Sequence, residues 1–475
     1  MENLTQNPVT AGIWCRVIDN FGDAGVAWRL ALSLKREYGW CVTLIIDKPE
    51  TLAAFVPEVD AAGDACTALG IRVMRWNAAA ECFFSKATNL PDVTVEAFSC
   101  RLPDGVEEAL SHRFDMKPTA VFALDYLTAE TYAEESNGLV SRHPRFGYPK
   151  TFVFPGFTEK TGGIVREADI SEARKAFEAA GGKTAFLESS GADPAAPFTL
   201  FFFTYPTEAV DALAGAFASD KRPLQILLAP GAASEKLAAA LAAAGNPAHV
   251  TTVRLPLLPQ CEFDKPLLAC DCALVRGEDS TVRVQLAGTP LLWMLYPQTE
   301  DTHLVKLAAF TKLYTRGMAE DDARIWSGLE AGLNGRILTP AAWSAYRDRF
   351  PAMQKAAQAW RTYLSCLTTA PEYIAQKALK QIKCWVNEKF LPRSGRFTRM
   401  PLHVPRLPIQ SSPIQGKTQN ENRAGTACRQ CVHGRQGSHG CAQGRIFQGR
   451  PRSFHRQDED EEPVEQRRDG NRLPC

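Results

Sequence analysis

Short apolar runs alternate with helical patterns through the first third of the chain. An apolar run at residues 12–18 is followed by a helical pattern at 24–38 and by a second apolar run at 40–46. Short strands that alternate with helices are typical of a parallel, doubly wound sheet. Further strands of this sheet are predicted at 71–75, 93–96 and 120–124.

A second alternating unit begins at residues 198–204, with the letters F-T-L-F-F-F-T. It predicts a second Rossmann-like domain, with strands at 223–229, 249–254, 271–275 and 290–295, and helices at 233–244, 280–286 and 302–310. The α/β fold expected is thus two Rossmann-like domains that face each other across a cleft. Such a cleft suits a nucleotide-linked donor and a separate acceptor.

The pattern divides the chain into four parts. We expect an N-terminal Rossmann-like domain at 1–150, a C-terminal Rossmann-like domain at 151–345 and C-terminal helices at 346–390. Residues 141–163, rich in Gly and Pro, are expected to be a linker. The tail at 391–475 is rich in Arg, Gln, Gly, Pro and Ser and has no periodicity, which predicts disorder.

Composition excludes several classes of protein. An apolar fraction of 45% is enough to build cores, and the length of 475 residues fits about two to three domains. No stretch approaches the ~18 consecutive apolar residues of a membrane span, and the first twelve residues do not form a secretory signal. We therefore expect a cytoplasmic protein with reduced cysteines and no membrane partner.

The net charge of +1 conceals two opposite parts. Residues 1–392 carry a net charge of −6 and residues 393–475 a net charge of +7. A basic tail can bind nucleic acid, but this one has no RNP-like motif and no alternating aromatic residues. No nucleic-acid partner is therefore expected.

The first strand runs into the segment D-N-F-G-D-A-G at residues 19–25. A dinucleotide fold would place G-x-G-x-x-G here, with bare amides for a pyrophosphate. Two carboxylates, Asp19 and Asp23, stand there instead, and they fit a cationic ligand or a base that removes a proton. The alternative is that Asp23 caps the helix. Gly22 and Gly25 permit close backbone approach in either case.

A second turn, R-G-E-D-S at 276–280, joins a strand to a helix in the second domain. Backbone amides at this helix start, or Arg276, can hold a diphosphate, and Glu278 can accept hydrogen bonds from sugar hydroxyls. The alternative is a capped helix with a surface Arg–Glu pair. Just upstream, Gln260 and Phe263 can hydrogen-bond and stack on a nucleobase, or simply pack.

Taken together, five stretches resemble the EarP family, the protein-arginine rhamnosyltransferases that modify elongation factor P. They are W-C-R-V-I-D-N-F-G-D (14–23), F-P-G-F-T-E-K-T-G-G (154–163), L-P-Q (258–260), V-R-G-E-D-S (275–280) and Y-P-Q-T-E-D-T-H (296–303). The general resemblance extends to about residue 364. The pairing of I-D-N-F-G-D with R-G-E-D-S at this separation is specific, whereas neither half alone would be.

The resemblance implies a GT-B glycosyltransferase that needs no metal. Its co-substrate would be dTDP-β-L-rhamnose, and it would transfer rhamnose with inversion to the guanidine of one arginine in elongation factor P. The modification would activate that factor for rescue of ribosomes stalled at polyproline. The alternatives are a GT-B transferase with another nucleotide sugar or acceptor, and a non-catalytic binding partner of elongation factor P.

The resemblance also implies roles for individual residues. Asp23 would be the general base, with Asp19 and Glu278 as further essential acids. The donor would be bound by Asn20, Phe21, Gly22, Tyr205, Gln260, Phe263, Arg276, Gly277, Asp279 and Ser280. Two positions depart from the family pattern. Phe is usual where Leu257 stands, which weakens one base-stacking contact, and an aromatic or larger apolar residue is frequent at Thr281.

The basic tail carries a ligand-like pattern, with Cys428, Cys431, His433, His439 and Cys441 closely spaced. It superficially resembles a zinc knuckle, but the segment lacks the apolar residues of a small core. Read one nucleotide out of frame, residues from 420 onward can encode M-K-T-A-Q-E-L-R-A-G-N-V-F-M-V-G-K, which resembles the start of elongation factor P. Our hypothesis is that the chain runs out of frame, from a point between about 375 and 420, into the gene for its own substrate. The genomic DNA tests this hypothesis.

Overall fold

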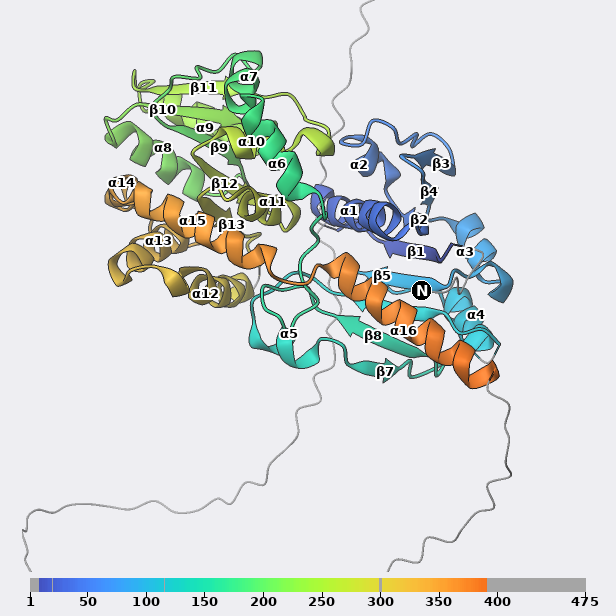
Figure 1. The fold of residues 1–475 in the computed structure, drawn as a ribbon. Helices are drawn as coiled ribbons and strands as arrows, with labels where there is room; N and C mark the ends of the chain where they lie inside the picture. Colours follow the sequence, from blue (N-terminus) through green and yellow to red (C-terminus); the bar gives the residue numbers. More distant parts are fainter. Residues whose placement is uncertain (1–7, 19, 115, 299–300, 391–475) are drawn as a thin grey trace, which may run out of the picture. The chain divides into compact units, whose positions relative to one another are not determined.

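The computed structural model describes residues 8–18, 20–114, 116–298 and 301–390. The chain divides into a unit of Met1–Arg396 and a unit of Phe397–Cys475. All of the second unit, with the predicted tail, its zinc-like pattern and the out-of-frame segment, lies outside the described residues. The first unit contains two β-sheets with helices packed on them (Figure 1).

The first sheet has eight strands in the order β3-β4-β2-β1-β5-β6-β8-β7. Its strands are β1 (Thr10–Cys15), β2 (Cys41–Ile46), β3 (Ala65–Ala68), β4 (Ile71–Arg75), β5 (Val93–Ala97), β6 (Ala120–Leu124), β7 (Val140–Arg142) and β8 (Pro149–Val153). The strands between the two edges are parallel, whereas β3 and β7 pair antiparallel to their neighbours. The sheet is therefore mainly parallel, as expected, and the two antiparallel edge strands, β3 and β7, were not among the strands predicted from the sequence.

The segment expected to be a linker, 141–163, holds two pieces of this sheet. It includes most of β7 and all of β8. The Gly- and Pro-rich residues around β8 conceal this strand in the sequence, but it forms because it pairs in parallel with β6 and antiparallel with β7. The domain boundary expected at residue 150 accordingly falls inside β8, which ends at Val153.

The second sheet has five parallel strands in the order β11-β10-β9-β12-β13. They are β9 (Thr199–Phe203), β10 (Leu224–Leu228), β11 (Val250–Arg254), β12 (Cys272–Arg276) and β13 (Leu291–Met294). The central strand β9 reads T-L-F-F-F and is buried along almost its whole length. Such a continuous apolar run is characteristic of a parallel strand that helices cover on both faces.

Helices α1 to α5 accompany the first sheet and α6 to α15 follow through the second part of the chain. The first group is α1 (Asn20–Tyr38), α2 (Pro49–Ala53), α3 (Ala78–Phe84), α4 (Asp104–Phe114) and α5 (Thr131–Ser136). The second group is α6 (Ile170–Ala179), α7 (Gly182–Ser189), α8 (Ala209–Ser219), α9 (Ala232–Ala243), α10 (Asp264–Ala269), α11 (Asp279–Ala287), α12 (Thr302–Tyr314), α13 (Glu320–Leu333), α14 (Pro340–Asp348) and α15 (Phe350–Ser365).

The last helix, α16 (Ala370–Phe390), packs against the first sheet rather than the second. Its residues Ile374, Ala375 and Ala378 are fully buried in the core that also contains β1, β2 and α1 (Figure 1). The chain therefore returns to the domain in which it began, and the helices expected at 346–390 divide between the two cores.

Candidate active site

A pocket opens at the carboxyl ends of the strands of the second sheet. In open α/β sheets this edge is where ligands bind. The second sheet and its connections supply most of the lining, and the first part of the chain supplies three residues. The lining is Phe21, Gly22, Phe55, Phe201, Phe203, Tyr205, Ala229, Pro230, Leu255, Pro256, Leu257, Leu258, Gln260, Phe263, Arg276, Gly277, Glu278, Asp279 and Ser280.

The structure brings together ten of the thirteen residues that the sequence singled out. Those ten line the pocket: Phe21, Gly22, Tyr205, Gln260, Phe263, Arg276, Gly277, Glu278, Asp279 and Ser280. Asp23 is buried one residue beyond the lining, Asn20 begins α1, and Asp19 lies outside the described residues. The helix expected from residue 24 begins at Asn20, so Phe21 and Gly22 belong to its first turn.

The carboxylate of Asp23 holds the loop that precedes its own helix. Asp23 is 3% exposed, and its Oδ2 accepts a hydrogen bond of 2.8 Å from the backbone N–H of Ile18. Asp47, at the end of β2, accepts an equivalent bond of 2.8 Å from the N–H of Val17. Two carboxylates thus fix the β1–α1 loop. The bond from Asp23 to a backbone N–H just before its helix resembles the one that an acidic side chain makes in a capping box.

The turn between β12 and α11 is fixed by bonds to its own backbone. Gly277 has a φ of +68°, in the left-handed region that favours glycine, and its carbonyl accepts bonds from Trp293 Nε1 (3.0 Å) and Thr281 Oγ1 (2.8 Å). The Ser280 hydroxyl donates to the carbonyl of Arg276. Thr281 is fully buried and does not line the pocket, so a different side chain at this position would act on the turn.

Glu278 joins the second domain to the first. Its Oε1 lies 2.8 Å from Lys306 Nζ on α12, and its Oε2 accepts a bond of 2.9 Å from the N–H of Leu127, in the loop after β6. The surface Arg–Glu pair considered from the sequence is not what forms, because Glu278 pairs with Lys306. The Arg276 guanidinium instead lies over the ring of Tyr205, 4.7 Å from its centroid.

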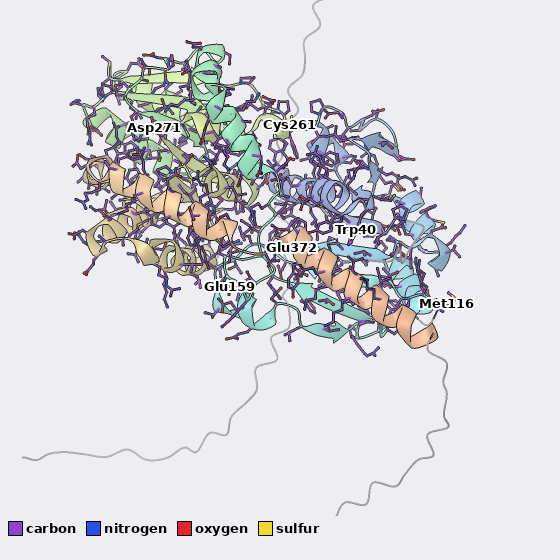
Figure 2. The ribbon with its side chains drawn as sticks, in the orientation of Figure 1. Trp40, Met116, Glu159, Cys261, Asp271 and Glu372 are labelled. Carbon is purple, nitrogen blue, oxygen red and sulfur yellow. The ribbon has the colours of Figure 1, made fainter. Side chains whose placement is uncertain are left out.

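Gln260 and Phe263 lie on one side of the pocket. The Gln260 N–H donates to the carbonyl of Phe55 (2.7 Å) and its Nε2 to the carbonyl of Gly25 (3.1 Å), both in the first part of the chain. Cys261, labelled in Figure 2, marks this segment. The Phe263 ring packs edge-on against Phe203 at 6.0 Å, which leaves apolar surface on which a flat base can stack.

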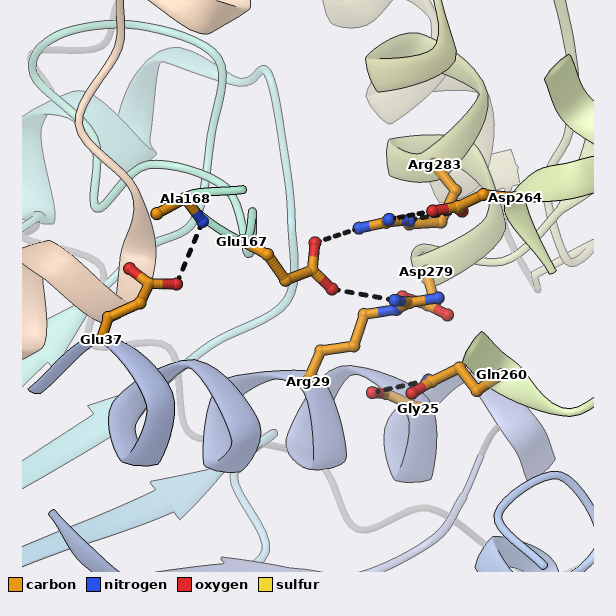
Figure 3. Close-up of polar contacts among 9 residues, drawn as sticks. All are labelled: Gly25, Arg29, Glu37, Glu167, Ala168, Gln260, Asp264, Asp279 and Arg283. Atoms are coloured by element: carbon orange, nitrogen blue, oxygen red, sulfur yellow. Dashed lines mark hydrogen bonds and ion pairs between the residues drawn. The ribbon is translucent and has the colours of Figure 1, made fainter. Parts of the chain in front are cut away.

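Sequence reasoning found Asp279 but missed Arg29, Arg283 and Glu167, which help to hold α1 against α11. Arg29 on α1 bonds Asp279 Oδ1 (2.8 Å) and Glu167 Oε1 (2.9 Å), and Arg283 on α11 pairs with Glu167 and Asp264 (Figure 3). One signal was available: Arg29 interrupts the apolar run A-W-R-L-A-L, and a buried arginine needs an anionic partner. No local sequence pattern indicates that Glu167 takes part in this cluster.

The described residues show neither a metal-binding cluster nor a membrane span. No group of three or more His, Cys, Asp or Glu side chains there is arranged to hold a metal ion. In the same part of the chain, no helix combines the length and the apolar character needed to cross a bilayer.

Known proteins resemble this chain over most of its length. Residues 11–376 match the family model described as elongation factor P (EF-P) rhamnosyltransferase EarP. The protein-arginine rhamnosyltransferase of Pseudomonas putida is 36% identical over 363 residues, covering 74% of this chain and 93% of that protein. That of Neisseria meningitidis serogroup B is 33% identical over 391 residues, covering 79% and 98%.

A solved structure also matches, described as the structural basis for EarP-mediated arginine glycosylation of translation elongation factor EF-P. It has a TM-score of 0.50 and 25% identity, and covers 80% of this chain and 99% of that one. With the two facing Rossmann-like sheets, this match identifies the fold as GT-B. The chain belongs to the EarP family of elongation factor P rhamnosyltransferases.

Proposed function

We propose that this protein-arginine rhamnosyltransferase transfers L-rhamnose, with inversion, from dTDP-β-L-rhamnose to the guanidine of one arginine in elongation factor P. The reaction takes place in the cytoplasm, and the modified factor rescues ribosomes stalled at polyproline. The observation that carries the proposal is one pocket that is lined by Gln260 and Phe263, by the N-terminus of α11 and by the first turn of α1.

The donor fits the second-domain side of this pocket. The thymine base stacks on Phe263 and hydrogen-bonds the Gln260 amide, while the diphosphate meets the N-terminus of α11 at Asp279 and Ser280. Backbone amides and the helix dipole stabilise the charge that grows on the leaving diphosphate. Arg276, at the end of β12, adds a positive charge beside it.

The acceptor arginine enters from the α1 side. A guanidinium is a poor nucleophile because its pKa is above ~12 and its lone pairs are delocalised. As its nitrogen forms a bond to C1 of rhamnose, the C1–oxygen bond to the diphosphate breaks and dTDP leaves with the electron pair. Asp23 takes the proton that the nitrogen loses. The carboxylates also stabilise the positive charge that develops on the sugar.

The pair Asp23 and Asp47 offers a matched test of the base. Each carboxylate accepts one loop amide at 2.8 Å, and Asn can still accept that bond while being unable to take a proton. We expect Asp23→Asn to lower kcat by about 10²–10⁴-fold, the usual contribution of a general base, and Asp47→Asn to change it little. Mass spectrometry of elongation factor P, incubated with each variant and dTDP-rhamnose, measures the added rhamnosyl mass.

Equal losses in the two variants would show that Asp23 serves only the loop. A wild-type chain that binds elongation factor P without modifying it would support the non-catalytic alternative. Assays with UDP- and GDP-linked sugars in place of dTDP-rhamnose test the other alternative. The Gln260 amide should distinguish guanine from thymine, whereas uracil presents the same hydrogen-bonding groups as thymine and lacks only its methyl group.

A further inference from the structure

Five charged side chains lie together where α1 meets α11. Arg29 and Arg283 are 6% and 3% exposed, and both bond Glu167, which stands between β8 and α6 (Figure 3). Arg283 also pairs with Asp264, and Arg29 with Asp279. The cluster therefore holds three carboxylates and two guanidinium groups, so it carries one excess negative charge when all are ionised.

One of these carboxylates lies where the negatively charged diphosphate of the donor should bind. Asp279 is the first residue of α11 and lines the pocket. A carboxylate at a helix N-terminus is stabilised by the helix dipole, but it competes for that terminus with a diphosphate and repels it. The site can accept an anionic donor only if this charge is compensated.

Arg29 supplies the compensation from the other domain. Its Nε bonds Asp279 Oδ1 at 2.8 Å. Its Nη2 is buried with no hydrogen-bond partner in the described part of the chain, and in a guanidinium this atom shares the edge that carries Nε. The edge of Arg29 that faces Asp279 thus makes one of its two possible hydrogen bonds. The guanidinium therefore contributes its positive charge beside Asp279 in addition to its packing.

We propose that Arg29 is a positioning residue for donor binding: by pairing with Asp279 it neutralises this carboxylate and leaves the α11 amides to the diphosphate. The inference rests on the proposed function, because it assumes a diphosphate donor in this pocket. Arg29 lies six residues after Asp23 on the same helix, so the pair also ties the candidate base to the donor site.

Arg283 provides the matched control. It is as buried as Arg29 and shares Glu167 with it, but its other partner is Asp264 rather than Asp279. Arg29→Met and Arg283→Met should both lower the melting temperature. Only Arg29→Met should raise the KM for dTDP-rhamnose and the Kd for dTDP, by about tenfold or more, with a smaller change in kcat.

Two further variants separate charge from structure. Arg29→Lys keeps the charge and should recover much of the dTDP affinity. In a double-mutant cycle, Arg29→Met should cost less affinity in an Asp279→Asn background than in the wild type, because the charge to be neutralised is gone. Isothermal titration calorimetry with dTDP alone measures all of these affinities without the acceptor.

The results distinguish this inference from the proposed function. If the wild type does not bind dTDP, the proposed function fails. If it does, equal Kd values for wild type and Arg29→Met overturn the role of Arg29. Equal KM increases in Arg29→Met and Arg283→Met, or a penalty unchanged by Asp279→Asn, overturn it as well, because each shows a purely structural effect.

Discussion

Leu257 is a pocket residue at a position where we expect Phe in the family pattern. Its side chain lines the pocket and is 49% exposed, so it covers the donor site without being fixed in a core. A phenyl ring at this place would add a flat surface opposite the aromatic side of the base subsite. Aromatic pairing contributes about 0.5–1.5 kcal/mol beyond area burial.

We therefore expect Leu257→Phe to lower the KM for dTDP-rhamnose by about two- to tenfold while leaving kcat nearly unchanged. Steady-state kinetics with saturating elongation factor P measures this, and the melting temperature serves as the control for folding. An unchanged or higher KM would show that residue 257 does not contact the base.

Sequence reasoning succeeded for residues whose neighbours along the chain carry the chemistry. Glu278, Asp279 and Ser280 form one turn, so their common place in a pocket could be predicted from a single strand–helix junction. Arg29 and Asp279 are 250 positions apart, and only tertiary packing brings them together. No local pattern encodes such a pair.

At the scale of elements, α1 comes close to the segment around Gln260 at Gly25. A Cβ built there would lie 3.2 Å from both Asp279 Oδ2 and Gln260 Nε2. Glycine within a helix costs roughly 1 kcal/mol relative to alanine, so helix propensity alone would favour alanine at this position. The close approach of the two elements explains the glycine.

Gly25→Ala should therefore raise the KM for dTDP-rhamnose several-fold, because Asp279 and Gln260 must shift to admit the methyl group. Its gain in helix propensity should offset the crowding, so the melting temperature should move by no more than about 2 °C. Gly215→Ala in α8, where a Cβ meets no atom within 4 Å, is the control and should stabilise the protein with unchanged KM. Equal KM values for both variants would contradict the close approach.

Helices and strands, like single residues, could be predicted where their own sequence carries the signal. The strands with continuous apolar runs, such as β6 and β13, lie within one residue of the predicted bounds, since a strand buried on both faces has apolar residues at successive positions. The edge strand β7 is a three-residue strand whose residues are all exposed, so it carries no hydrophobic signal. Its pairing with β8 depends on a partner rather than on its own composition.

At the scale of the whole molecule, Glu167, in the segment between β8 and α6, bonds arginines from both domains, Arg29 on α1 and Arg283 on α11. Burial raises the pKa of this carboxyl, but Arg283 and Arg29 outweigh burial and lower it to about 2. Asp264 and Asp279 face the same arginines, and the nearby Glu37, whose pKa is raised by burial, accepts a bond from the N–H of Ala168. Comparing the wild type with Glu167→Gln isolates the contribution of Glu167, since the other groups are common to both proteins.

A carboxyl whose pKa is lowered on folding stabilises the native state above its unfolded pKa and loses that stabilisation as the pH falls. The wild type should therefore exceed Glu167→Gln in unfolding free energy by on the order of 3 kcal/mol at pH 6–7. This difference should shrink as the pH falls from about 4.5 toward 2. Urea denaturation at a series of pH values measures it, with Glu235→Gln, from an exposed ion pair, as the control. A difference that stays constant down to the lowest pH at which the chain folds would mean that Glu167 acts through its hydrogen bonds alone and not through its charge.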